Sequence, residues 1–153
     1  MLLTICALIS IVLAALVAGM FSGPWLALTR SMATFEPSVF LAIVDRLNRN
    51  MAPLMTILLP VSLLSMAPLL ILAYGDRPTM FALTLAALVS FAVALLVTMM
   101  IEVPIVKQIT TWTVATLPAN WRQLRDRWGA FHIIRVVAGL AGFALLVAGA
   151  LSL

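Results

Sequence analysis

Five residues in the last third of the chain carry side chains capable of chemistry and share one helical face. Their spacings of 4, 3, 4 and 3 place them within about 80° of one another at roughly 3.6 residues per turn. The set contains the only histidine of the chain, and its members are Trp121, Arg125, Trp128, His132 and Arg135. An imidazole can serve as an acid, a base or a metal ligand, a guanidinium can bind an anionic oxygen, and indole rings can stack on a flat ligand. This face is therefore the first candidate for a functional site.

The elements that must position this face are membrane helices. Hydrophobic residues make up 65% of the chain and charged residues only 9%, with a mean hydropathy of +1.22. Four stretches without charge each reach or approach the roughly 20 residues that cross a bilayer core: 1–29, 50–75, 78–101 and 136–153. We predict an all-α fold, an integral membrane four-helix up-and-down bundle that forms a single domain over residues 1–153. Its helices are expected at about 2–25, 51–74, 79–103 and 121–152.

Basic residues are distributed by topology rather than gathered into a nucleic-acid-binding patch. Seven lie in the two long loops and one, Arg77, lies in the short turn between them. The positive-inside rule then places both long loops in the cytoplasm and both termini outside, in the cell (inner) membrane. The first span lacks the positively charged start of a secretory signal, so we expect it to be retained. The expected partners are the lipid bilayer and a hydrophobic small molecule, with no nucleic acid.

Short interfacial amphipathic helices are predicted in the two cytoplasmic loops. In the first loop, Glu36-Pro37 is typical of a helix start, and apolar residues at helical spacing continue it over about 37–49. The second loop leads into a helix that begins near Asn120, which Gln123 would complete as a capping-box-like pair. We expect the third span to end at Glu102-Val103-Pro104, because proline disrupts a helix interior.

The topology brings acidic groups to the same membrane boundary as the histidine. Glu36, Glu102, His132 and Arg135 come from three segments whose ends are neighbours in a four-helix bundle. His132, Glu102 and Glu36 could bind one divalent metal ion, or a carboxylate and the imidazole could form an acid–base pair beside an arginine. The remaining alternative is an interfacial anchor, in which Arg125 and Arg135 contact lipid phosphates, the tryptophans anchor at the interface and Glu102 forms an ion pair with Arg135.

A resemblance to a known family covers the same segment most sharply. The segment contains Val103-Pro104 near the end of the third span and then the pattern R-x-x-W-x-x-x-H/N-x-x-R, which is formed by Arg125, Trp128, His132 and Arg135. With these motifs the chain resembles the anthrone oxygenase-like family. This is a large group of small four-helix membrane proteins, mostly of unknown function. Its best-known members oxidise anthrones to anthraquinones with molecular oxygen.

One neighbourhood departs from the family pattern. Members usually carry asparagine close to the Val-Pro motif, whereas this chain has Glu102 and Lys107 there. The resemblance therefore implies the fold, and it does not extend to the substrate.

The leading expectation is an integral membrane oxidoreductase, an oxygenase acting on a hydrophobic aromatic or quinone-like substrate at the cytoplasmic boundary. The expected catalytic residues are His132 as base or metal ligand, Glu102 as its partner, and Arg125 or Arg135 as the oxyanion stabiliser. Trp128, Trp121 and Glu36 are the expected substrate-binding residues. Either no cofactor is required or a single divalent metal is used, since no Gly-rich nucleotide loop or CxxCH motif is present.

The alternative function is a non-enzymatic small membrane protein, such as a transporter or an assembly or accessory subunit. The first span also contains Gly19 and Gly23, a GxxxG pair that would allow close packing of two helices. A homodimer is therefore a further expectation.

Overall fold

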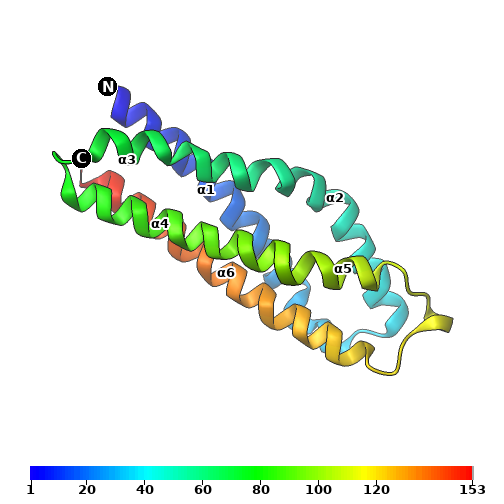
Figure 1. Ribbon diagram of the computed structural model, residues 1–153. Helices are drawn as coiled ribbons and strands as arrows, with labels where there is room; N and C mark the ends of the chain where they lie inside the picture. The colour runs from blue at the N-terminus through cyan, green and yellow to red at the C-terminus, as the bar shows by residue number, and fades with distance from the viewer. Residues whose placement is uncertain (153) are drawn as a thin grey trace.

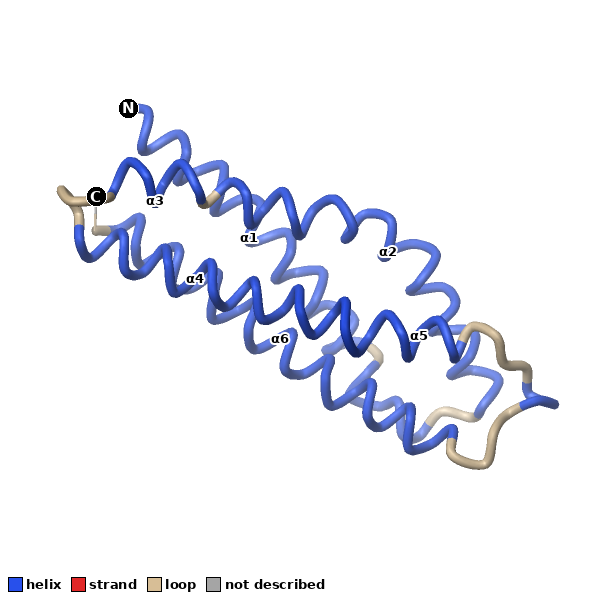
Figure 2. The backbone as a smooth tube through the Cα atoms, viewed as in Figure 1, coloured by secondary structure: helices blue, strands red, loops and turns tan. Residues whose placement is uncertain are grey.

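The computed structural model describes residues 1–152, and it is a bundle of four long helical segments (Figure 1). Each segment is long and apolar enough to cross a membrane: Leu2–Thr34, Pro37–Ala73, Pro78–Ile109 and Trp121–Leu151. Both termini lie at one end of the bundle, as an even number of antiparallel helices requires (Figure 1). Apart from a short break between α2 and α3, the non-helical segments lie at the two ends (Figure 2). The predicted all-α four-helix bundle is confirmed.

The predicted amphipathic helix of the first loop is not separate from the second span. Helix α1 (Leu2–Ala27) is followed by the 3-10 turn η1 (Thr29–Thr34), and then by α2 (Pro37–Ser65). Pro37 occupies the start of α2 as predicted, because its fixed φ suits the first helical turn and its missing N–H is not needed there. The predicted amphipathic helix and the second span form this one continuous helix. The interfacial segment and the membrane segment are therefore rigidly joined.

The second span is interrupted once, at Met66. Pro53 and Pro60 lie inside α2 without ending it, whereas Pro68 lies in the first turn of α3 (Ala67–Ala73). A tight turn then leads to α4, and Gly75 adopts a φ of 84° there, which a residue with a Cβ rarely does. The short turn expected around Arg77 is therefore present, and α4 begins directly after it at Pro78.

The third span continues beyond the predicted end, so the prediction that it stops at about residue 103 was wrong. Helix α4 (Pro78–Val97) passes into a π-helical turn, η2 (Thr98–Glu102), and then into α5 (Val103–Ile109). The N–H of Val103 donates to the carbonyl of Thr98, five residues back. This wider turn displaces the carbonyl that would otherwise meet the ring of Pro104, which explains how a proline is accommodated here. A π-helical turn contains one residue more than an α-helical turn, and Glu102 is the last residue of this one.

The fourth span begins without the predicted capping pair. The 3-10 turn η3 (Val114–Thr116) precedes α6 (Trp121–Leu151), and Asn120 stands at the cap position but makes no side-chain capping bond. Its φ of −94° and ψ of 12° are not the extended values from which a capping side chain reaches the first N–H groups. The backbone instead closes the turn, because the N–H of Trp121 donates to the carbonyl of Pro118.

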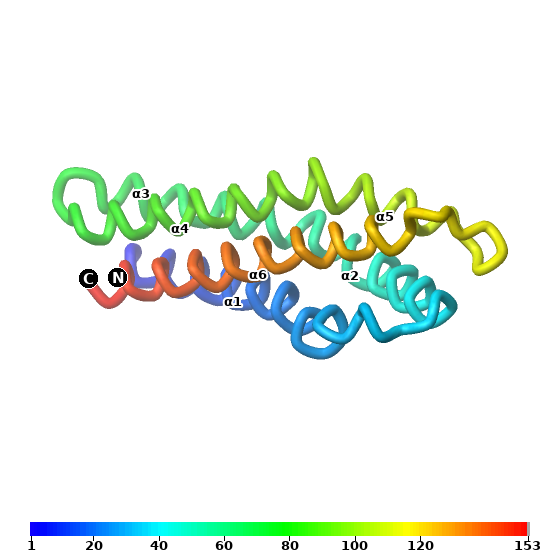
Figure 3. The backbone as a smooth tube through the Cα atoms, turned by 90° about the horizontal axis from the view of Figure 1, so that it is seen from below, coloured from blue at the N-terminus to red at the C-terminus, as the bar shows by residue number. Residues whose placement is uncertain are grey.

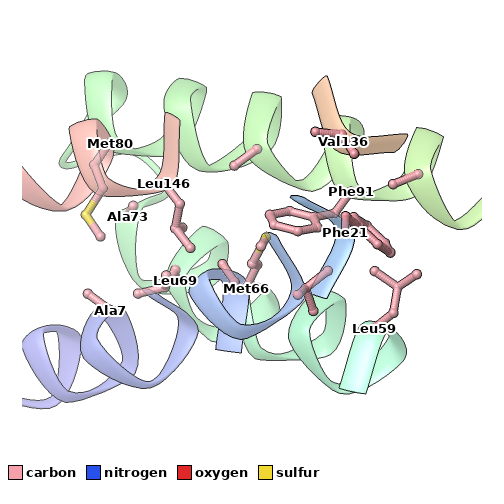
Figure 4. Packing of buried hydrophobic residues seen from close by; sticks show 14 residues of the cluster. Ala7, Phe21, Leu59, Met66, Leu69, Ala73, Met80, Phe91, Val136 and Leu146 are labelled. Carbon is pink, nitrogen blue, oxygen red and sulfur yellow. The ribbon is translucent and has the colours of Figure 1, made fainter. Parts of the chain in front are cut away.

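Helix α6 packs against both α4 and α1 (Figure 3). Phe21, Phe91 and Val136 from these three helices gather in the apolar core (Figure 4). Two glycines of α6 allow this approach: a Cβ on Gly139 would lie 2.9 Å from the ring of Phe21, and one on Gly142 would lie 2.8 Å from the ring of Phe91. Close helix contact in this bundle therefore depends on α6.

The GxxxG pair of α1 has no such role within the chain. A Cβ added to Gly19 or Gly23 would have no atom within 4 Å, and both residues are exposed. Packing of this face against a second copy of the chain stays a prediction.

Replacing Gly142 with alanine is expected to destabilise the bundle by about 1–3 kcal/mol, because the new methyl group would overlap the ring of Phe91. Gly19→Ala is the matched control, and we expect a change within about 0.5 kcal/mol. The free energy of unfolding in mixed micelles measures both. Equal values for the two variants would contradict the packing described for α6.

Candidate functional site

Three polar side chains from two elements form a buried cluster toward the end of the bundle far from the termini. Arg135 donates from Nη1 to Oε2 of Glu102 at 2.6 Å and from Nη2 to Nδ1 of His132 at 2.8 Å. Oε1 of Glu102 lies 3.6 Å from the same Nδ1. Glu102 is 3% exposed and His132 is 2% exposed, whereas 15% of the Arg135 side chain is exposed. We call Glu102, His132 and Arg135 the buried triad.

The local structure of each element places these groups together. His132 and Arg135 are three residues apart on α6 and therefore lie on the same face. The π-helical turn η2 carries both Glu102 and Thr98, and Arg135 Nη1 also donates to Oγ1 of Thr98 at 3.3 Å. The guanidinium lies over the ring of Phe21 from α1, 4.7 Å from its centroid. Arg135 is thus held by contacts from three helical segments.

The contact with Arg135 determines which nitrogen of His132 bears the proton. A guanidinium has only N–H donors, so Nδ1 must accept the 2.8 Å hydrogen bond with its lone pair. The imidazole is then neutral, with its hydrogen on Nε2. In the alternative tautomer, the proton would be on Nδ1 and would point toward Oε1 of Glu102. The 3.6 Å between these two atoms is too long for a hydrogen bond, and this proton would also clash with the N–H of Arg135.

Several buried polar atoms at this site have no hydrogen-bond partner among residues 1–152. They include one carboxylate oxygen and two ring nitrogens, namely Glu102 Oε1, His132 Nε2 and Trp128 Nε1. Buried polar groups are nearly always paired in folded proteins, because an unpaired one costs about 1–3 kcal/mol. With Nε of Arg135, which also has no partner among these residues, one acceptor and three N–H donors are therefore available for a ligand.

The other predicted site residues divide between this cluster and a second one. Trp128 adjoins the buried triad, because its ring centroid is 6.0 Å from that of His132. Arg125 instead pairs with Asp126 at 2.8 Å and lies over the ring of Trp121. Trp121 packs on Phe40 of α2 with 5.7 Å between ring centroids. Among the described residues, no hydrogen bond or ion pair connects Arg125 to the triad.

Glu36 is not part of the cluster either. It is exposed at the start of α2, and no group of three His, Cys, Asp or Glu side chains suited to a metal ion occurs within residues 1–152. The donors that are present do not fit a divalent cation, because Arg135 occupies both Oε2 of Glu102 and Nδ1 of His132 with positive charge.

An open cleft of about 460 Å³ lies on another side of α6, between this helix and the segment formed by α1 and η1. It is lined by residues of α1, η1 and α6, including Trp25, Arg30, Asp126, Gly129 and Ile133. The triad itself faces the other side of α6 and does not line the cleft. A substrate therefore reaches Glu102 and His132 only when neighbouring side chains move.

Two contributors were missed in the sequence. Phe21 supports Arg135 from α1, and Asp126 neutralises Arg125 from the adjacent position. Asp126 could have been identified from the sequence, because it is an acidic residue directly next to Arg125. Nothing in the sequence around Phe21 distinguishes it from the other apolar residues of α1.

Comparison with known proteins assigns the family. The family model described as anthrone oxygenase matches residues 40–145, a range that contains all of the triad and Trp128 but not Glu36. No curated protein and no solved structure matches the chain. Because the family match covers well over half of the sequence, the chain belongs to the anthrone oxygenase family.

Proposed function

We propose that this protein is a membrane oxidoreductase that uses molecular oxygen to oxidise a hydrophobic aromatic substrate of the anthrone or phenol type. The observation that carries the proposal is a buried carboxylate, Glu102, with one oxygen held by Arg135 and the other without a partner. A group held in this way is suited to accept a proton from a bound substrate. The family assignment supports oxygen as the oxidant.

The chemistry starts with removal of a proton by Oε1 of Glu102. An anthrone that loses a proton from its CH2 carbon becomes a delocalised phenolate, which can pass electrons to oxygen without a cofactor. That carbon then forms a C–O bond with O2, the O–O bond breaks, and its second C–H bond is lost. One anthrone and one O2 thereby give one anthraquinone and one water. The proton held by Glu102 leaves with the departing hydroxide as water.

Arg135 and His132 have supporting roles in this proposal. Arg135 positions the carboxylate and the imidazole, since it bonds to both. His132 acts as a hydrogen-bond donor through Nε2, because its other nitrogen accepts from Arg135. The basic residues of the two long loops support a cytoplasmic position for this end of the bundle, with both termini outside a cell membrane.

Purified protein in lipid nanodiscs should convert anthrone to anthraquinone faster than anthrone oxidises spontaneously. We expect one O2 consumed per anthrone, measured with an oxygen electrode and by absorbance of the product. The control variant is Asp45→Asn, which removes an exposed carboxylate that pairs only with Arg49 on the surface; it should retain the wild-type rate. Absence of any protein-dependent oxidation of anthrones and related phenols would favour a transporter or accessory subunit instead.

A further inference from the structure

We infer that Trp128 and His132 form a two-donor subsite for an acceptor oxygen, which binds the carbonyl or phenolate oxygen of a planar aromatic ligand. The inference deepens the proposed function and rests on it. It assigns Trp128 a polar role in addition to stacking. The inference rests on two buried N–H groups, His132 Nε2 and Trp128 Nε1, that have no hydrogen-bond partner among the described residues.

His132 supplies the first donor. Arg135 fixes the proton of the neutral imidazole on Nε2, because Nδ1 accepts the guanidinium N–H at 2.8 Å. Nε2 is buried and has no acceptor among the described residues. An imidazole held in this state presents a donor, and a carbonyl or phenolate oxygen is the complementary group.

Trp128 supplies the second donor, one helical turn earlier on α6. An indole Nε1 can only donate, and this one is buried in a side chain that is 5% exposed. The rings of Trp128 and His132 are tilted by 33° with centroids 6.0 Å apart. Residues four apart lie on the same helical face, so both side chains lie on one side of α6. A carbonyl oxygen has two lone pairs, and a phenolate oxygen accepts more strongly because it is charged.

Such a subsite discriminates by polarity rather than by shape. A site with buried donors binds a ligand lacking the acceptor poorly, because its N–H groups then stay unpaired. Each unpaired donor corresponds to roughly tenfold to a hundredfold in affinity. The same donors would stabilise the phenolate that forms when Glu102 takes a proton, so they act where charge develops.

The test compares two fused-ring ligands of similar shape, anthraquinone and anthracene, by calorimetric titration of the full-length protein in nanodiscs. We expect the wild type to bind anthraquinone at least ten times more tightly than anthracene. Trp128→Phe keeps the aromatic surface and removes the N–H, so it should weaken anthraquinone binding about tenfold and leave anthracene binding unchanged. Trp112→Phe, in the loop between α5 and α6, should change neither.

A second measurement uses the fact that His132 is the only histidine. In protein labelled with 15N-histidine, the ring nitrogens should show the neutral form protonated on Nε2. The Nε2 signal should shift on addition of anthraquinone and not of anthracene. An Nδ1-protonated ring, or equal effects of Trp128→Phe on both ligands, would overturn the inference; the latter result would mean that Trp128 only stacks or that water satisfies the donors.

The two proposals fail separately. Protein-dependent anthrone oxidation with no preference for anthraquinone would overturn the subsite and keep the oxygenase function. A preference that Trp128→Phe removes, without any oxidation, would keep the subsite as a binding site and overturn the oxygenase function.

Discussion

Replacing Glu102 with glutamine is expected to lower the rate of anthrone oxidation by about 10²- to 10⁴-fold, the usual contribution of a positioned acid or base. The amide keeps the shape of the side chain and still offers an oxygen to Arg135, but it cannot accept a proton in the working pH range. The steady-state rate measured by oxygen uptake gives the comparison with wild type.

Two controls separate loss of the base from loss of the fold. The Glu102→Gln variant should elute from size exclusion like the wild type, although it should unfold more easily because Arg135 loses its counter-charge. Asp45→Asn should oxidise anthrone at the wild-type rate. A Glu102→Gln variant that oxidises anthrone normally would show that the buried carboxylate has no part in the chemistry.

Replacing Arg135 with leucine is expected to destabilise the bundle by about 3–5 kcal/mol, because it leaves the buried charge of Glu102 without a partner. The double variant Glu102→Leu/Arg135→Leu removes both charges and should recover most of that loss, since apolar replacements for a buried pair are often neutral or stabilising. Unfolding in denaturing micelles measures the free energy in each case.

Arg49→Leu is the matched control, because it breaks an ion pair that is exposed on α2. Its expected cost is about 0–1 kcal/mol, as for other surface pairs. A loss for Arg135→Leu no larger than that of Arg49→Leu, or no recovery in the double variant, would contradict the buried pairing of Glu102 and Arg135.

The four membrane spans and part of the site could be predicted from the sequence, because both depend on the spacing of residues along the chain. Charge-free stretches of membrane length identify the four spans, and residues three apart on one helix, His132 and Arg135, must be neighbours. The ion pair between Glu102 and Arg135 was foreseen as an interfacial contact. The structure confirms the pair but places it in the interior, with Glu102 only 3% exposed.

The π-helical turn could not be predicted from the spacing of residues. A proline usually ends a helix, so Pro104 predicted the end of the third span. Whether the chain stops or widens its turn depends on the neighbours that satisfy the freed groups, and a local pattern does not contain them. The position of Glu102 within the bundle depends on that turn.

The five residues at the start of α6 share one helical face, as predicted, but this face is too long to form a single site. From Trp121 to Arg135 it spans 14 residues, or about 21 Å along the axis. Arg125 pairs with Asp126 at the helix start, whereas His132 contacts Glu102. Trp128 links the two regions, because it packs in the same apolar cluster as Trp121 and lies beside the ring of His132. Periodicity identifies the side of a helix, and only the partner segments divide that side into separate clusters.

The most direct test of the central claim is proton exchange in the absence of oxygen. Anthrone incubated anaerobically with the protein in D2O should gain deuterium at its CH2 carbon faster than in buffer, because Glu102 removes that proton before oxygen reacts. The account predicts that the wild type and Asp45→Asn accelerate this exchange, measured by mass spectrometry, and that Glu102→Gln does not. Exchange at the buffer rate with wild-type protein, or full acceleration with Glu102→Gln, would contradict it.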